Sequence, residues 1–367
     1  MPSVDPQHVV VAMSGGVDSS AAALLLARAG HRVTGVTLRL YDVEGVPSGA
    51  HQGCCTLDDI EDARRVCAVL GIPHYVMDAR EGFRTHVMDY FVAEYRRGRT
   101  PHPCIACNDR IKFDLLAGQA EALGAGAVAT GHYARIAREP DGSFALLRGV
   151  DQSKDQSYVL AGLGQAQLAR TLLPVGSFPK TRIRALAAEA GLHLAAKRDS
   201  QEVCFIPSGD YRAYLAERAA EAGEGARPGD LVDETGAVVG THPGVEGFTV
   251  GQRRGLGVAL GERRFVTGVD PATGRVAVGP ESALWKRAVA VEGMRWVSGH
   301  APAGTRRVQA KLRYGGEPAR ALAEPGPDGT LTLHFEAPQR APTPGQAAVL
   351  YDGERVLGGG TIAQALD

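Results

Sequence analysis

The chain has 367 residues, of which 44% are hydrophobic, so it can bury a substantial core and is long enough for two or three domains. Its formal net charge of -1 argues against a protein coated with positive charge for indiscriminate nucleic-acid binding, but leaves room for a local basic face. No run approaches the roughly 18 uninterrupted apolar residues of a membrane span, and the stretch from Met1 to Gln7 has no basic and apolar signal pattern. We therefore expect a cytoplasmic protein with no membrane partner.

The first third of the chain alternates short apolar runs with amphipathic helices. This alternation predicts βαβ units and a doubly wound parallel sheet covered on both faces. In that architecture ligands bind beyond the carboxyl ends of the strands. The predicted strands are residues 9–13, 32–38, 74–78 and 127–130, and the predicted helices are residues 19–29, 57–70 and 81–97.

A Gly-rich turn, Ser14-Gly15-Gly16-Val17-Asp18-Ser19, joins the first predicted strand to the first predicted helix. Adjacent glycines let the backbone approach an anion, and the serine hydroxyls and the N–H groups of the helix N-terminus complete a phosphate cradle. The turn has neither the Lys of the GxxxxGK[ST] loop nor the spacing of GxGxxG, and the alternative is an ordinary βα turn. Asp18 would repel phosphate unless it caps the helix or binds Mg²⁺, and we favour the metal-linked role.

The six cysteines are too few for a disulfide scaffold, so each needs its own explanation. Two prolines precede Cys107 and are predicted to deliver it to the start of a helix at residues 108–123, where the helix N-terminus lowers the pKa of a thiol. Cys204 follows a polar run and leads into an apolar, strand-like end. Cys67 falls on an apolar helix stripe and is predicted to be core. Cys54 and Cys55 lie in a Gly-flanked loop and receive no role.

The spacing Cys104-x-x-Cys107 fits half of a zinc site, a dithiol redox pair, or a loop with one reactive cysteine and one passenger. A structural zinc site would need a second Cys pair or paired histidines, which the sequence lacks. Cys104, Cys107 and Cys204 together could also hold three corners of an iron–sulfur cluster. We rank direct dithiol chemistry above the cluster.

Beyond about Ile206, Gly and Pro clusters separate short alternating runs, which predicts an all-β region. Residues 306–314, 330–335, 347–351 and 355–358 are the predicted strands of a small barrel. We therefore predict a catalytic domain at residues 1–206, a central β-rich domain at residues 207–280 and a C-terminal β-barrel at residues 281–367.

Three ordered motifs resemble those of the tRNA-specific 2-thiouridylases, a family of the ATP pyrophosphatase (PP-loop) superfamily. They are the Gly-rich turn, Arg99-Thr100-Pro101-His102-Pro103-Cys104-Ile105-Ala106-Cys107-Asn108, and Ser200-Gln201-Glu202-Val203-Cys204-Phe205-Ile206. Further similar motifs at residues 129–135, 154–158, 248–257 and 312–314 extend the resemblance over nearly the whole chain.

The resemblance implies an enzyme that uses ATP and Mg²⁺ to adenylate the C2 oxygen of the wobble uridine in tRNAs for Lys, Glu and Gln, and then replaces that oxygen with sulfur. It implies that Cys107 is the nucleophile, that Cys204 carries a persulfide, and that a cysteine desulfurase or a relay protein supplies the sulfur. It also implies that the tRNA anticodon loop is the RNA partner. The implied ATP contacts are Ala12, Met13, Ser14, Gly15, Gly16, Val17, Asp18, Ser19, Leu38 and Gly131. The implied RNA contacts are His102, Pro103, Cys104, His132, Lys154, Asp155, Gln156, Arg313, Tyr314 and Gln346.

One departure from the family pattern stands out. The family often has Asn-Pro-Asp where this chain has His102-Pro103-Cys104, so a base contact made by that Asp is not carried over. Two other functions compete with thiolation: an amide-forming synthetase of the same superfamily, which needs no paired cysteines, and an RNA-binding redox module. Polar residues interrupt the apolar runs at many points, which suggests a monomer in the absence of RNA.

Overall fold

The computed structural model describes residues 7–42, 57–197, 203–223, 225, 227–258 and 262–367. Cys54, Cys55 and the run Ser200-Gln201-Glu202 lie outside this part of the chain. Within it, no helix has the length and apolar character needed to cross a membrane.

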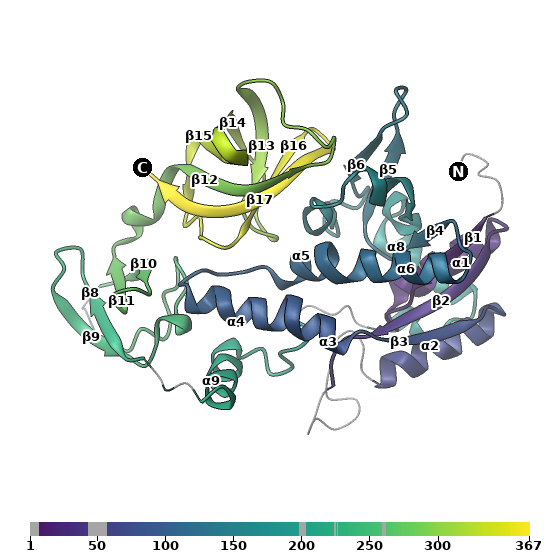
Figure 1. The fold of residues 1–367 in the computed structure, drawn as a ribbon, viewed down its shortest axis with the longest axis horizontal. Helices are drawn as coiled ribbons and strands as arrows, with labels where there is room; N and C mark the ends of the chain where they lie inside the picture. Colours follow the sequence, from purple (N-terminus) through teal and green to yellow (C-terminus); the bar gives the residue numbers. More distant parts are fainter. Residues whose placement is uncertain (1–6, 43–56, 198–202, 224, 226, 259–261) are drawn as a thin grey trace.

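A five-stranded parallel sheet forms the centre of the N-terminal region, with the strand order β3-β2-β1-β4-β7 (Figure 1). The order reverses between β1 and β4, which is the switch point where ligands bind in doubly wound sheets. The observed sheet confirms the predicted fold class. Its strands are β1 (His8–Ala12), β2 (Arg32–Arg39), β3 (His74–Asp78), β4 (Ala127–Ala129) and β7 (Thr171–Leu172).

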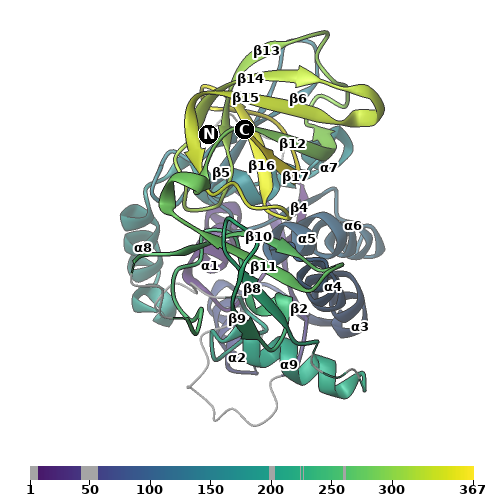
Figure 2. The same cartoon turned by 90° about the vertical axis from the view of Figure 1, so that its left-hand side faces the viewer.

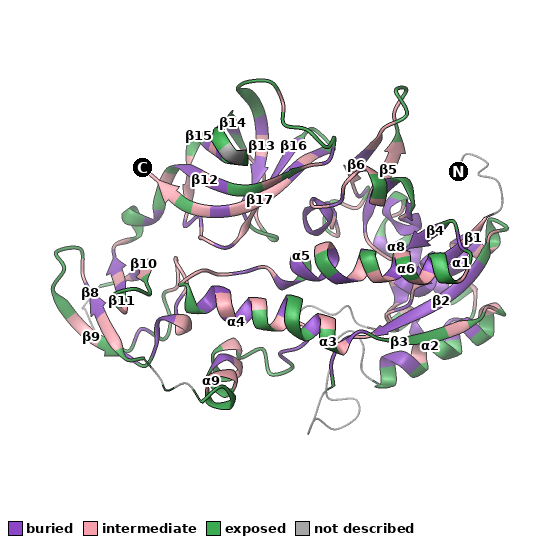
Figure 3. Ribbon diagram, in the orientation of Figure 1, coloured by how far each residue is buried: buried purple, intermediate pink, exposed green. Residues whose placement is uncertain are grey.

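Side chains of β1 alternate between two apolar clusters, because successive residues of a strand point to opposite faces of its sheet. Val9 and Val11 pack with α1 (Val17–Arg28), α2 (Leu57–Leu70) and α8 (Lys180–Glu189), whereas Val10 packs with the opposite layer. That layer contains α3 (Arg80–Phe83), α4 (Asp89–Arg96), α5 (Pro103–Cys107) and α6 (Phe113–Ala122). Figure 3 shows the inner strands buried beneath both layers.

The helix that carries Cys107 begins earlier than predicted. Pro103 is its first residue, with His102 at the N-cap, and the helical backbone runs through α5, a π-helical turn (Asn108–Lys112) and α6. Proline is favoured at the first helical position, where its missing N–H costs no hydrogen bond. Cys104 therefore lies at the helix start, Cys107 lies one turn inside it, and the prediction that Cys107 occupies the N-terminus is wrong.

The remainder of the chain is mostly β-structure, as predicted. A four-stranded sheet has the order β10-β11-β8-β9, and six strands close into a barrel in which β12 pairs with both β15 and β17. Figure 2 shows the barrel at the top, with the four-stranded sheet below it and in front of the helices. These strands are β8 (Gly229–Val232), β9 (Val238–His242), β10 (Phe265–Asp270), β11 (Arg275–Gly279), β12 (Trp285–Trp296), β13 (Arg306–Lys311), β14 (Ala319–Pro325), β15 (Leu331–Arg340), β16 (Ala347–Asp352) and β17 (Arg355–Leu366).

Three local features differ from the sequence prediction. The hairpin of β5 (Ala134–Arg138) and β6 (Phe144–Arg148) extends the barrel sheet through one pair between Arg355 and Leu147. An additional helix, α9 (Tyr211–Glu221), is capped by the Asp210 carboxylate. The predicted strand-like end around Cys204 consists of turns, with the Ile206 N–H donating to the Val203 carbonyl at 2.9 Å.

Candidate functional site

The Gly-rich turn after β1 is held in shape by its own serines. The Ser14 N–H donates to Ser19 Oγ at 3.2 Å, and the hydroxyls of Ser19 and Ser20 donate to the Gly16 carbonyl at 3.1 and 2.8 Å. Gly16 is the N-cap of α1 and makes no side-chain cap, so the first N–H groups of the helix face the turn. This geometry suits a phosphate group at the positive end of the α1 dipole.

Two glycines let neighbouring backbone pack directly against this turn. Gly15 has φ +68°, and a Cβ there would lie 2.3 Å from the Asp59 carbonyl oxygen in α2. Gly131 follows β4, and a Cβ there would lie 2.6 Å from both the Asp18 carbonyl carbon and the Ser19 nitrogen. Any larger residue would push these segments away from the turn, which explains the requirement for glycine at both positions.

The charge of Asp18 is balanced within the protein. Lys180 Nζ contacts both carboxylate oxygens at 2.8 Å, and the Tyr133 hydroxyl donates to Oδ1 at 2.7 Å. The Lys180 side chain is 9% exposed and its ammonium lies 5.7 Å from the centroid of the Tyr133 ring. A metal role for Asp18 stays a prediction, and it would require Lys180 to release the carboxylate.

Lys197 ties the Gly-rich turn to α2. Its ammonium donates to the Gly15 carbonyl at 2.9 Å, to Asp59 at 2.8 Å and to Asp62 at 2.7 Å. Although partial burial acts against the charged form, these carboxylates raise the pKa of Lys197 above its ordinary value. Lys197 is also the last described residue before the segment that leads to Cys204.

The other implied nucleotide contacts lie where β1 and β2 end. Ala12 is the last residue of β1, and Met13 is buried, with its N–H donating to the Val36 carbonyl at 2.8 Å. Leu38 is buried near the end of β2, and Val17 is buried in the first turn of α1. All four therefore surround the carboxyl end of the sheet, as the fold class requires.

Cys107 and Cys204 pack into the same apolar cluster. Cys107 is buried, and Cys204 is half-buried against that cluster. Phe205, next to Cys204, has its ring centroid 5.8 Å from Phe83 in α3 and 5.4 Å from Phe91 in α4. These helices also pack against the Cys107 helix, where a Cβ on Gly82 would lie 3.4 Å from Ile111. The two cysteines, remote in sequence, therefore share one apolar cluster, in which Phe205 packs on Phe83 and Phe91.

A short loop connects the Gly-rich turn to the Cys107 helix. Gly131 packs on the backbone of Asp18 and Ser19, and the next residue, His132, stacks on Phe113 with a centroid distance of 6.2 Å. Phe113 is six residues beyond Cys107, which corresponds to about 9 Å along a helix. Burial lowers the pKa of His132 to about 3, so the ring is neutral near pH 7 and its Nδ1 pairs with the Thr130 hydroxyl at 2.7 Å.

An aromatic cluster lies beside Cys104. The rings of His102, Tyr158 and Tyr314 lie 5.6 to 6.0 Å apart, and Lys311 Nζ lies 5.8 and 5.7 Å from the centroids of the two tyrosine rings. Burial lowers the pKa of His102 to about 4, and its Nδ1 is buried without a hydrogen-bond partner among the described residues. Cys104 is exposed and close enough for its charge to raise the pKa of Tyr314, after the larger effect of burial.

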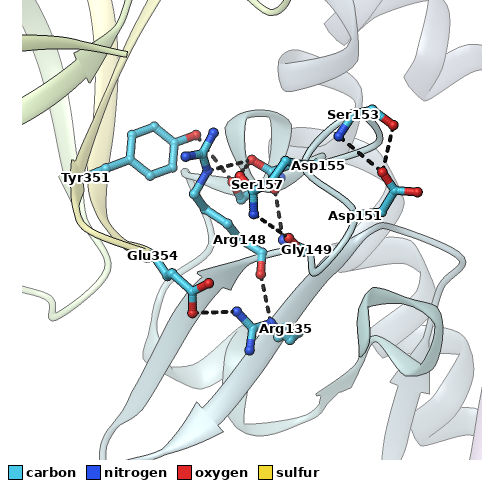
Figure 4. A network of polar contacts seen from close by, with 10 residues as sticks. Arg135, Arg148, Gly149, Asp151, Ser153, Asp155, Ser157, Tyr351 and Glu354 are labelled. Carbon is cyan, nitrogen blue, oxygen red and sulfur yellow. Dashed lines mark hydrogen bonds and ion pairs between the residues drawn. The ribbon is translucent and has the colours of Figure 1, made fainter. Parts of the chain in front are cut away.

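The implied RNA contacts on the segment after β6 differ in their accessibility. Gln156 hydrogen-bonds Tyr314 and accepts from the Tyr133 N–H at 3.0 Å, and Lys154 is half-buried nearby. The Asp155 carboxylate is buried and engaged with the protein itself (Figure 4). Its partners are the Gly149 N–H, the Ser157 N–H and hydroxyl, and Arg148 Nε, at 3.0 to 3.1 Å.

The barrel supplies the remaining implied RNA contacts. Arg313 Nη2 donates to the Arg340 carbonyl at 2.5 Å, next to the exposed Tyr314. Gln346 Nε2 donates to the Thr100 carbonyl at 2.8 Å, so its amide contacts the segment ahead of the Cys107 helix. Pro103 is buried at the start of that helix. His102, Cys104, Gln156 and Tyr314 are therefore brought together, whereas Gln346 joins another contact.

In the part of the chain that the structure describes, metal ligands do not gather at the cysteines. Among the described residues, no group of three or more His, Cys, Asp or Glu side chains could hold a metal ion. Cys104, Cys107 and Cys204 are all described, so in this conformation they do not form the ligand set of an iron–sulfur cluster. Cys67 is buried as predicted, and burial raises the pKa of its thiol to about 12.

Sequence reasoning missed several residues of this region. Lys180 and Lys197 received no role from the sequence, and only tertiary contacts bring them to Asp18 and Gly15. Tyr133 and Tyr158 did belong to motifs that the resemblance identified, at residues 129–135 and 154–158. That was the one signal that could have marked them.

Comparisons with known proteins agree with this arrangement. A family model described as the tRNA methyl transferase HUP domain matches residues 7–208, the tRNA methyl transferase PRC-barrel domain matches residues 219–280, and the aminomethyltransferase beta-barrel domain matches residues 286–362. The tRNA-specific 2-thiouridylase MnmA of Heliobacterium modesticaldum is 49% identical over 98% of this chain and 94% of its own length. The proteins of the same name from Chloroflexus aggregans and Moorella thermoacetica are 50% and 48% identical, over 97% and 96% of this chain and 98% of their own lengths. The chain therefore belongs to the MnmA family of tRNA-specific 2-thiouridylases.

Proposed function

We propose that the protein is a tRNA sulfurtransferase that uses ATP to convert the wobble uridine of tRNAs for Lys, Glu and Gln to 2-thiouridine. The observation that carries the proposal is the Thr130–His132 loop, which packs on the phosphate-binding turn at Gly131 and on the Cys107 helix at His132. These contacts link the phosphate cradle to the helix that carries Cys107. The names of the relatives supply the reaction class.

The first step makes the C2 oxygen of uracil a good leaving group by transferring AMP to it, with release of pyrophosphate. Ser14, Gly15, Gly16 and the first N–H groups of α1 suit the phosphates of ATP, which enters with Mg²⁺. Lys180 adds a positive charge that is already positioned at Asp18. Such preorganised charge stabilises a developing anion without reorganisation cost.

The second step delivers sulfur to C2. A cysteine desulfurase or a relay protein loads Cys204 as a persulfide, and the Cys107 thiolate attacks Cys204 Sγ. The persulfide S–S bond breaks, hydrosulfide leaves and attacks C2, AMP departs, and a Cys107–Cys204 disulfide remains for a dithiol to reduce with two electrons. In the alternative order the terminal sulfur attacks C2 first, and Cys107 then releases the product. Both orders leave the same disulfide, and both need Cα atoms within about 7 Å.

The RNA side of the site is proposed to be the aromatic cluster beside Cys104. A uridine in a single-stranded loop can leave its stack for a few kcal/mol and stack on aromatic side chains. His102 and Tyr314 offer such rings, and Gln156 and Arg313 offer hydrogen-bond donors. We propose that the protein acts as a monomer in the cytoplasm, where thiols stay reduced, and that the three predicted domains divide the binding of ATP and tRNA.

The test is mass spectrometry of tRNA nucleosides after incubation of unmodified tRNA with ATP, Mg²⁺ and a persulfide donor. We expect 2-thiouridine with the unaltered protein and none with Cys107→Ser or Cys204→Ser. Cys67→Ser is the matched control, because Cys67 is packed in the opposite layer. Product formation by both Ser variants would remove the sulfur-transfer roles.

The variant Cys104→Ser distinguishes the scheme with two reactive cysteines from an iron–sulfur cluster held by three. The scheme predicts that this variant retains thiolation, since Cys104 takes no part in the disulfide. Loss of thiolation, together with iron and sulfide in anaerobically purified protein that disappear in the variant, would replace the scheme with a cluster. Pyrophosphate release that does not depend on tRNA would instead favour a small-molecule synthetase.

A further inference from the structure

The segment between α4 and α5, residues 97–102, leads directly to Cys104 and Cys107. The barrel contacts it on one side and the central sheet region contacts it on the other. Figure 1 shows it running back beneath the barrel, alongside α4, to the start of α5. Pro101 and Pro103 restrict the backbone of this segment. A displacement at Thr100 is therefore passed on to the helix start rather than absorbed.

The barrel holds both main-chain polar groups of Thr100. The Thr100 N–H donates to the Pro344 carbonyl at 2.8 Å, and the Thr100 carbonyl accepts from Gln346 Nε2 at 2.8 Å. Gly345 lies between these partners with φ +91°, and a Cβ there would lie 2.7 Å from the Thr100 nitrogen. The barrel loop is itself fixed, because the Gly345 N–H donates to the Ile362 carbonyl at 2.9 Å and the Ile362 N–H donates to the Gln346 carbonyl at 2.8 Å.

The central sheet region holds the same segment from the other side. The Thr100 hydroxyl donates to the Thr249 hydroxyl at 3.2 Å, and the Thr249 N–H is fixed by Gln252 at 3.2 Å. Gly98, with φ +69°, packs so closely on β10 that a Cβ would lie 3.0 Å from Val269. Thr249 and Gln252 belong to the motif at residues 248–257, which the proposed reaction leaves without a role.

An ion pair adds a third contact. Arg99 Nη2 donates to Glu292 of β12 at 2.7 Å. Residues 98–100 thus contact the barrel at Glu292, Pro344, Gly345 and Gln346, and contact the central region at Thr249 and Val269.

We propose that Gln346 is a positioning residue, which holds residues 97–102 against the barrel and thereby sets the position of Cys104 and Cys107. Thr249 has the matching role on the central side. The inference rests on the proposed function for its effect on turnover. The positioning of residues 97–102 itself is a property of the protein without tRNA.

The test uses the reactivity of the cysteines without RNA. Trypsin cuts after Arg99 and Arg110, so the peptide of residues 100–110 carries both cysteines. Gln346→Glu keeps the size of the side chain and removes the donor, which leaves the Thr100 carbonyl unpaired. We expect iodoacetamide to alkylate Cys107 in this variant at least about threefold faster than in the unaltered protein, as fragment masses would show.

Turnover supplies the second readout. A positioning role predicts that kcat for thiolation falls by about tenfold while KM for tRNA changes by less than about twofold. Gln339→Glu is the matched control, because the Gln339 amide bonds only carbonyls of its own strand, Ala337 and Pro338. We expect this variant to match the unaltered protein in both readouts.

Unchanged alkylation together with a raised KM for tRNA would overturn the proposal and leave Gln346 with the predicted RNA contact alone. If Gln346→Glu does not fold, as thermal unfolding would reveal, Thr249→Val tests the same segment from the other side with the same expected changes. The alkylation result stands even if the protein thiolates no tRNA, so failure of the proposed function and failure of this inference are separable.

Discussion

The phosphate-binding end and the thiol end of the site are built in different ways. At the phosphate end, six consecutive residues supply the turn, and its hydrogen bonds join neighbours such as Ser14, Gly16 and Ser19. At the thiol end, Cys107 and Cys204 are almost a hundred residues apart and share one apolar cluster with rings on α3 and α4. The first end is a local structure, whereas the second depends on the packing of several elements.

Because of this difference, the two ends of the site should respond differently to substitutions. A local turn fails when a charge or a Cβ is placed wrongly inside it, because its backbone approaches its neighbours within van der Waals distance. A packed site fails gradually, because a shift of one element changes the distance between two reactive atoms without unfolding the protein. Substitutions at each end should therefore give distinct patterns of stability and activity.

The largest effect is expected at Lys180, which lies beneath the turn. Lys180→Met leaves the Asp18 carboxylate without its cation, and we expect a loss of about 3 kcal/mol in the free energy of unfolding and at least a hundredfold loss in pyrophosphate release. Adding Asp18→Asn should restore most of the stability but not the activity. Urea unfolding and a pyrophosphate assay measure the two, and full activity in the double variant would contradict a role for this charge.

Gly131 offers a test of close backbone approach. Gly131→Ala should weaken ATP binding at least tenfold and lower stability by about 2 kcal/mol, because its Cβ would meet the Ser19 nitrogen at 2.6 Å. Gly118→Ala in α6 is the control, since no atom lies within 4 Å of its Cβ and alanine favours a helix by up to about 1 kcal/mol. Calorimetric titration with ATP and thermal unfolding check the pair, and equal ATP affinity in both variants would show that the packing at Gly131 is unimportant.

The pH dependence of stability tests the loop that links the two ends. The pKa of His132 is lowered by burial to about 3, below the ordinary value of 6.5, so the unfolded chain binds a proton that the folded protein excludes. Stability is therefore lost as pH falls below about 6.5. Between pH 7 and pH 5 we expect this residue to account for about 1 to 2 kcal/mol of the loss.

His132→Gln should flatten the decline, and His300→Gln, at an exposed position, should leave it unchanged. Urea unfolding at several pH values gives the comparison. If the free energy of unfolding falls with the same slope against pH in all three proteins, His132 can be protonated in the folded state.

The smallest effect is expected at Lys197, whose side chain is 34% exposed. Lys197→Met should lower stability by about 1 kcal/mol, because solvent screens its ion pairs with Asp59 and Asp62. The KM for ATP should rise by several fold, since the Gly15 carbonyl loses its donor. Lys286→Met, which removes an exposed pair with Asp367, is the control. An unchanged KM for ATP in Lys197→Met would show that the hydrogen bond from Lys197 to Gly15 does not affect ATP binding by the turn.

The comparison also explains which parts the sequence could predict. The strand at 74–78 was predicted at its observed bounds, and the helix at 57–70 ends where it was predicted to end. The helix start at Pro103 was missed because two prolines read as a loop, although proline at the first helical position costs nothing. The ion pair of Lys180 with Asp18 and the contact from Gln346 to Thr100 form between residues that meet only in the folded chain, and no local pattern marks such pairs.

The central claim, that Cys107 and Cys204 act together on sulfur, has one direct measurement. The protein, loaded with persulfide and mixed with ATP, Mg²⁺ and a slight excess of tRNA without a reductant, completes one turnover. Mass spectrometry then counts 2-thiouridine and disulfide-linked peptides. The account predicts one Cys107–Cys204 disulfide for each 2-thiouridine formed. Product without that disulfide, or a disulfide that joins Cys204 to Cys104 instead, would contradict it.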